Sequence, residues 1–165
     1  MKKKITVIIS ALLLTLSASA QFEKDKVYIG SSLTGLNLSY SGLEKFSIGA
    51  QGQVGYFVAQ DLMLYAQAGY HHSGVEGASD EVSVGVGGRY YIEQNGIFLG
   101  ANCNLVHAYH NYNDVRPGVE VGYAFFLSRT VTIEPAIYYV QSFKKHSDYS
   151  SVGLKVGFGI YLFNN

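Results

Sequence analysis

The sequence predicts an all-β fold, a closed antiparallel up-and-down barrel of eight strands, on three observations. Segments in which every second residue is apolar recur about eight times along the chain. Because side chains alternate between the two faces of a strand, each segment has one apolar face and one small or polar face. Tight turn sequences alternate with longer polar connections between the segments. Beyond the N-terminal region, no apolar run reaches the roughly 18 residues that a membrane-spanning helix needs.

The final segment shows the alternation most clearly. Its apolar face carries Val152, Leu154, Val156, Phe158, Ile160 and Leu162, and its opposite face carries Ser151, Gly153, Lys155, Gly157, Gly159 and Tyr161. The same pattern predicts strands near 26–40, 45–58, 62–72, 81–94, 97–110, 115–127, 131–142 and 149–163. In the first strand the apolar parity changes at Gly35, which predicts a β-bulge. Pro135 cannot donate a ladder hydrogen bond, so it predicts a second bulge, beside Glu134.

The connections between the strands differ in length between the two rims of the barrel. Asn95-Gly96 is typical of a tight hairpin and predicts that Gln94 pairs with Ile97. Residues 59–61 and 128–130 form two more tight turns at the same rim. The other rim carries the longer connections, at 41–44, 73–80, 111–114 and 143–148. Short periplasmic turns opposite longer external loops are typical of an outer-membrane barrel.

The N-terminus predicts export. Lys2, Lys3 and Lys4 precede an apolar run from Ile5 to Leu16, and residues 18–20, Ala-Ser-Ala, form a small-residue cleavage site. This pattern predicts a signal peptide over 1–20 and a single barrel domain over 21–165.

Composition excludes several functional classes. Removing Lys2, Lys3 and Lys4 leaves nine basic against 12 acidic residues, a net charge of −3, which does not favour nucleic-acid binding. Cys103 is the only cysteine, so no intrachain disulfide can form. The five histidines show no recurring ligand spacing, so we expect no metal site and no cofactor. They are His71, His72, His107, His110 and His146.

The polar face decides which side of the barrel faces outward. It is rich in Gly, Ser, Asn and Gln and poor in Lys and Glu, whereas a water-exposed surface carries about 25–35% charged residues. Small residues suit the crowded lumen of an eight-stranded barrel. Aromatic residues of the apolar face lie near strand ends, as in the two interfacial girdles of a membrane barrel. We therefore expect the apolar face to contact lipid. A secreted, lipocalin-like barrel with the faces reversed is the alternative.

With this signal, this hairpin rhythm and the closing Gly157-Phe158-Gly159-Ile160-Tyr161-Leu162-Phe163, the chain resembles the small eight-stranded outer-membrane β-barrel domains of the OmpA/OmpX type. The resemblance covers residues 21–165 and implies location in the outer membrane of a Gram-negative cell. It also implies that the barrel-assembly machinery reads the terminal aromatic, although here Asn164 and Asn165 follow Phe163. We expect no C-terminal peptidoglycan-binding domain after the barrel, so that role of some relatives is not carried over to this chain.

Four charged residues have inward parity: Arg89, Glu120, Glu134 and Lys155. Because an isolated charge in a narrow lumen is costly, we expect them to pair in an interior network. The expected polar partners are Gln51, Gln53, Gln67, Asn102, Asn104, Tyr91 and Tyr138. Such a network would plug the lumen. An ion gate that exchanges partners is the alternative. Eight strands leave no open pore, so a general porin is excluded.

The function predicted from these features is non-enzymatic. We expect a monomeric outer-membrane barrel that contributes to envelope integrity or to surface interaction through its external loops. Its expected partners are outer-membrane lipids and lipopolysaccharide, the barrel-assembly machinery, and a surface ligand at loops 73–80 and 143–148. A lipid A-modifying enzyme is the alternative, because His71 and Ser73 lie close together at the external rim. No carboxylate is clearly placed in the sequence to orient that histidine, so we expect no catalytic residues.

Overall fold

The computed structural model describes residues 22–36, 47–73, 80–92, 95–108, 112–143 and 150–162. The predicted signal peptide, the predicted loop 41–44 and the central residues of the predicted loops 73–80 and 143–148 lie outside these ranges. Within the described residues, no helix has the length and the apolar character needed to cross a membrane.

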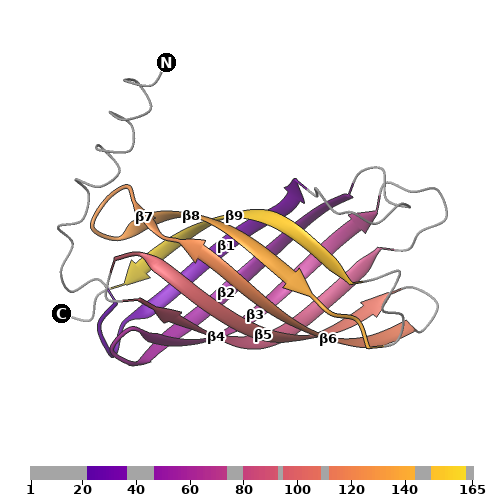
Figure 1. Cartoon of the computed structure of the whole chain (residues 1–165), viewed down its shortest axis with the longest axis horizontal. Coiled ribbons are helices and arrows are strands. Elements are labelled where there is room, and N and C mark those ends of the chain that lie inside the picture. The colour runs from indigo at the N-terminus through magenta and orange to yellow at the C-terminus, as the bar shows by residue number, and fades with distance from the viewer. Residues whose placement is uncertain are drawn as a thin grey trace, which may run out of the picture.

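The described chain folds into a single antiparallel sheet that closes on itself (Figure 1). The sheet order is β6-β5-β4-β3-β2-β1-β9-β8-β7, and β6 also pairs with β8. Because β7 continues the line of β6 along the same neighbour, the wall has eight strand positions. The predicted closed eight-stranded barrel is confirmed. The strands are β1 (Val27–Leu36), β2 (Ser47–Ala59), β3 (Leu62–Ser73), β4 (Glu81–Tyr91), β5 (Ile97–Ala108), β6 (Tyr112–Tyr123), β7 (Phe125–Phe126), β8 (Val131–Val140) and β9 (Ser151–Leu162).

The first and last strands close the wall. Val27 of β1 pairs with Leu162 of β9, and the pairing continues to Thr34 opposite Lys155. The register then shifts between Thr34 and Leu36, so the bulge predicted at Gly35 is confirmed. Closure leaves no edge strand, which satisfies the backbone hydrogen bonds that a hydrocarbon environment cannot satisfy.

The β4–β5 connection and the start of β6 differ from the prediction. The Ile92 amide donates to the Ile97 carbonyl at 2.8 Å, and Tyr91 pairs with Phe98. The connection at Asn95-Gly96 is therefore wider than a two-residue hairpin; Ile97 is bonded to Ile92, and Gln94, its predicted partner, lies outside the described residues. Strand β6 starts at Tyr112 rather than near 115, because residues 112–114 pair with β5 and extend the ladder.

The bulge predicted at Pro135 is also wrong. Pro135 pairs with Val156 of β9 without any change of register. On its other side, pairing stops after Gly122 opposite Ala136 and resumes at Phe125 opposite Ile133 in the same register. The missing amide hydrogen of Pro135 thus interrupts the ladder without inserting a residue, and this interruption separates β7 from β6.

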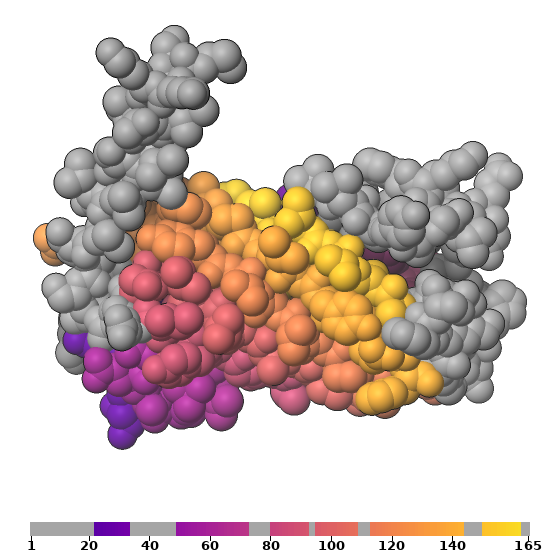
Figure 2. Space-filling view, in the orientation of Figure 1, coloured from indigo at the N-terminus to yellow at the C-terminus, as the bar shows by residue number. Residues whose placement is uncertain are grey.

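The apolar faces of the strands point outward. Leu33 is 63% exposed and Val86 65% exposed, whereas Tyr28, Tyr91 and Phe98 are buried in the lumen. Figure 2 shows one side of this outer wall as a continuous layer of side chains. An apolar surface of this extent is incompatible with free solution but suits a lipid bilayer. The arrangement therefore argues against the soluble barrel.

The lumen is sealed at the tight-turn rim by aromatic side chains, here called the aromatic base cluster. Phe22, just before β1, is fully buried and stacks on Tyr91 with the ring centroids 3.9 Å apart. The Phe22 carbonyl accepts a 2.8 Å hydrogen bond from the amide of Asp61, which fixes the segment to the β2–β3 turn. The cluster consists of Phe22, Phe57, Tyr91, Phe98, Phe126 and Tyr161.

Candidate functional site

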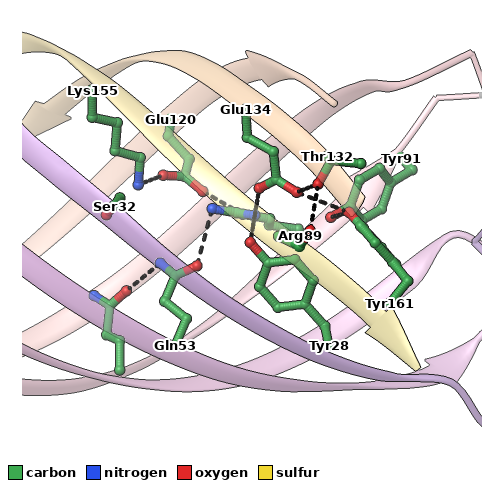
Figure 3. A network of polar contacts seen from close by, with 12 residues as sticks. Tyr28, Ser32, Gln53, Arg89, Tyr91, Glu120, Thr132, Glu134, Lys155 and Tyr161 are labelled. Atoms are coloured by element: carbon green, nitrogen blue, oxygen red, sulfur yellow. Dashed lines mark hydrogen bonds and ion pairs between the residues drawn. The ribbon is translucent and has the colours of Figure 1, made fainter. Parts of the chain in front are cut away.

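The centre of the lumen is organised around the guanidinium of Arg89, which projects inward from β4 (Figure 3). Its Nε donates to Glu120 Oε1 of β6 at 2.6 Å, and its Nη1 donates to Glu134 Oε2 of β8 at 2.8 Å. Arg89 is only 3% exposed, and the Phe98 ring centroid lies 4.4 Å from its Cζ. A single cation therefore bridges two buried carboxylates from different parts of the wall.

Each carboxylate oxygen of Glu134 accepts hydrogen bonds from two donors. Its Oε2 also accepts from Tyr28 Oη at 2.9 Å, and its Oε1 accepts from Thr132 Oγ1 at 2.8 Å and from Tyr161 Oη at 3.1 Å. Tyr161 in turn contacts Tyr91, with 3.0 Å between the hydroxyl oxygens. These contacts join the charged network to the aromatic base cluster below it.

Lys155 of β9 completes the set by forming an ion pair with Glu120. Two cations and two carboxylates thus balance in the lumen, as a low-dielectric interior requires. Gly100 provides the space, because a side chain at this position would collide with Glu120. Gly159 does the same beside Glu134.

A line of amide side chains extends the network across the barrel. Arg89 Nη2 donates to Gln53 Oε1 at 3.2 Å, Gln53 Nε2 donates to Gln67 Oε1 at 3.0 Å, and Gln67 donates to Asn104 at 2.5 Å. Asn104 then donates to Asn102 at 3.1 Å. The side chains point the same way along this line, so each carbonyl oxygen receives a donor from the preceding residue.

A second charged cluster lies nearer the loop rim. Arg116 of β6 binds Glu81 of β4 through two hydrogen bonds of 2.7 and 2.8 Å, in the bidentate geometry typical of arginine and carboxylate. Its Nε also donates to Asp114 at 3.1 Å. Asp114 accepts a further 2.6 Å hydrogen bond from Ser142, which follows β8.

The structure brings together all four charges that inward parity selected, with Gln53, Gln67, Asn102 and Asn104 among their predicted partners. Tyr91 is connected to the charged network through its hydrogen bond with Tyr161. Gln51 instead accepts a 3.3 Å hydrogen bond from Ser32. The predicted network did not include Tyr28, Thr132, Glu81 or Asp114. Arg116 was missed although it also has inward parity, so extending the parity rule to every charge in the predicted strands would have found it.

The outer surface carries a polar cluster at the loop rim. Asp80, just before β4, accepts a hydrogen bond from Tyr70 Oη at 2.6 Å, and its other oxygen lies 2.6 Å from His72 Nδ1. The expectation that no carboxylate is placed to orient a histidine concerned His71, which faces the lumen side of β3. Its outward neighbour His72, which the sequence did not single out, is the histidine that contacts Asp80.

The pKa of the Asp80 carboxyl is lowered from its ordinary value by the hydrogen bonds from Tyr70 and His72. A carboxyl with a lowered pKa in the folded state stabilises the fold above its unfolded pKa, and this contribution is lost as the pH falls through the folded pKa. We expect Tyr70→Phe to raise the Asp80 pKa, measured by NMR titration of the carboxyl carbon. Tyr90→Phe is the control, and an unchanged Asp80 titration in Tyr70→Phe contradicts the assignment.

Comparisons with known proteins identify the fold. No protein-family model matches the sequence, and no curated protein matches it. Among solved structures, the chain is similar to Neisserial surface protein A, at 16% identity and a TM-score of 0.61, with 82% of this chain and 95% of that chain covered. The N-terminal β-barrel domain of Pseudomonas aeruginosa OprF shows 14% identity and a TM-score of 0.59, with 84% and 98% covered.

The Yersinia pestis outer membrane protein Ail is also similar, at 13% identity and a TM-score of 0.59, with 84% of this chain and 100% of that chain covered. At these identities the likeness concerns the fold. The chain is an eight-stranded β-barrel of the outer-membrane type, as the resemblance in the sequence implies.

Proposed function

We propose that this chain resides in the outer membrane as a small, non-enzymatic barrel that serves envelope integrity or surface interaction. Its apolar exterior and closed wall support the location, because only structures without open strand edges span a bilayer. Side chains plug its lumen, so the barrel does not act as a pore. The observation that carries this proposal is Arg89, which is buried in the lumen and bridges carboxylates of β6 and β8.

Three layers of side chains support the plugged lumen. The aromatic base cluster fills the tight-turn end, the Arg89 network fills the centre, and Arg116 with Glu81 and Asp114 lies toward the loops. The charges in the centre balance, so no excess charge is left to attract a stream of ions. Opening a path would require breaking ion pairs that have almost no contact with water.

We therefore expect the refolded protein to show no steady open-channel current in planar lipid bilayers. The measurement is single-channel recording after insertion from detergent, with bilayers that receive the same detergent without protein as the control. Large, steady conductance in most insertion events would contradict the plug.

The external loops are the proposed contact region for a surface ligand. Deleting residues 73–80 and 143–148 is expected to abolish surface interaction while leaving a folded barrel that migrates faster on a gel unheated than boiled. The measurement is the adhesion of cells that display the deletion variant, compared with cells that display the wild-type chain. Undiminished adhesion would remove the loops from the proposal.

A lipid A-modifying enzyme is the second candidate, and the contact between Asp80 and His72 at the outer surface favours it. A carboxylate that orients a histidine is one component of several hydrolytic sites. Mass spectrometry of lipid A from cells with and without the protein separates the two candidates. Unchanged lipid A masses support the non-enzymatic role, and the loss or gain of an acyl chain supports the enzyme.

A further inference from the structure

The outer wall contains a groove at the loop end of β4, β5 and β6, here called the outer-face groove. Its volume is about 500 Å³, within the usual range of about 300–1,000 Å³ for ligand pockets. The strand registers arrange its outward side chains in two rows. The lower row is Val84, Leu105 and Val115, and the upper row is Val82, His107 and Asn113.

The two rows differ in chemistry. The lower row is wholly apolar, whereas the upper row ends in His107 and Asn113, with 2.6 Å between Nδ1 and Oδ1. Tyr70 of β3 pairs with Val82 and extends the upper row. Outward aromatic residues of this kind mark the membrane interface, so the groove passes from the hydrocarbon into the headgroup region.

The side wall of the groove is Phe143, which is 72% exposed. The chain that carries it is fixed to β6 at two points. The Gln141 amide donates to the Pro117 carbonyl at 2.9 Å, and Ser142 Oγ donates to Asp114 at 2.6 Å. Ser142 thus points into the lumen, and the next side chain, Phe143, lies over the outer face beside Val115.

A membrane lipid matches this groove better than a water-soluble ligand does. The groove opens on the face that contacts the bilayer, and its polar residues lie only at the interfacial end. Inside a bilayer, an acyl chain gains no hydrophobic free energy by leaving other acyl chains, so retention must come from packing in the groove and from hydrogen bonds at its upper end. The loop rim is the external side of an outer-membrane barrel, which places the groove in the outer leaflet.

We propose that the outer-face groove is a binding site for lipid A of the outer leaflet. One acyl chain lies along Val84, Leu105 and Val115 against Phe143, and the phosphorylated sugar head contacts His107 and Asn113. The inference rests on the proposed residence in the outer membrane and adds a specific lipid partner to it.

The test is native mass spectrometry of the full barrel, refolded in micelles that contain purified lipid A. We expect one lipid A to remain bound per barrel after the detergent is removed. Leu105→Trp, which fills the groove, should lower the retained fraction about tenfold, a loss of about 1.4 kcal/mol. His107→Ala should lower it about fivefold, the effect of one hydrogen bond.

Ile137→Trp is the matched control, because Ile137 also faces outward but lies on β8, away from the groove. The chain contains no Trp, so the Trp fluorescence of Leu105→Trp and of Ile137→Trp reports the introduced side chain alone. Every variant must show the faster migration of a folded, unheated barrel. If the wild-type chain fails to fold in micelles, the proposed function fails. If folded barrels retain no lipid A, retain phosphatidylethanolamine equally, or are insensitive to Leu105→Trp, only the lipid A site is overturned.

Discussion

Replacing Arg89 with methionine lowers the free energy of unfolding of the barrel by about 3–5 kcal/mol, the usual cost of removing one partner from a buried ion pair. The guanidinium neutralises Glu120 and Glu134, and both carboxylates are almost fully buried. Without it, Lys155 remains the only cation against two carboxylates in the central network. The measurement is urea unfolding in detergent micelles, followed by the fraction of the faster-migrating folded species.

A charge-balanced variant separates electrostatics from packing. Arg89→Met combined with Glu134→Gln leaves one cation, Lys155, paired with one carboxylate, Glu120. We expect this double variant to be more stable than Arg89→Met alone. Arg129 lies exposed in the turn between β7 and β8, so the control variant Arg129→Met is expected to leave the unfolding curve unchanged. Equal loss of stability in the single and double variants would contradict the electrostatic account.

Replacing Phe22 with alanine is expected to lower the free energy of unfolding by about 3 kcal/mol or more, in the range for buried Phe→Ala substitutions. Phe22 is fully buried, stacks on Tyr91 and contacts Phe57, Phe126 and Tyr161. The change would leave a cavity at the tight-turn end of the lumen, where the surrounding rings cannot collapse because the strands fix them.

Phe22→Leu is the matched comparison, because it keeps most of the apolar volume and should cost much less. Thermal unfolding in micelles, followed by circular dichroism at the β-sheet minimum, ranks the two variants against the wild-type chain. Alanine and leucine variants with the same midpoint as the wild type would show that the segment before β1 does not seal the barrel.

Alternation along the strands predicted the architecture because a closed barrel imposes the same two-sided environment on every strand. The rule placed Arg89 and Lys155 inside and Val86 and Leu105 outside, where the structure has them. It needs no knowledge of which strands are neighbours. The bulge at Gly35 was predictable for the same reason, because an inserted residue reverses the parity of everything that follows it.

Contacts that depend on tertiary pairing were not predictable in this way. Glu81 and Arg116 lie far apart in sequence, and only the pairing of β4, β5 and β6 brings them to the same end of the lumen, where their side chains meet. Phe22 lies before the first strand and belongs to no alternating segment, so nothing local indicated its burial. Asp80 lies in a connection, and its contact with His72 depends on how the chain enters β4.

The error at Pro135 has a different origin. A missing amide hydrogen can be accommodated by inserting a residue or by leaving the ladder unpaired, and both solutions fit the sequence. The structure leaves the ladder unpaired here: pairing of β6 with β8 ends at Gly122 opposite Ala136, and pairing of β7 with β8 resumes at Phe125 in the same register. The residues around Pro135 therefore do not distinguish the two solutions, which differ only in the register between neighbouring strands.

The pairing of β1 with β9 has a consequence for biogenesis. The opening strand of the barrel has no partner on one side until residues 151–162 have been synthesised. Until then, the unpaired backbone groups and the apolar face of β1 are exposed and can aggregate with other unfolded chains. Strand pairing between segments this distant in sequence is also slow. With the proposed residence in the outer membrane, this order of synthesis implies that the chain crosses the periplasm unfolded and needs chaperones there, and deletion of the final strand alone would leave a sheet that cannot close.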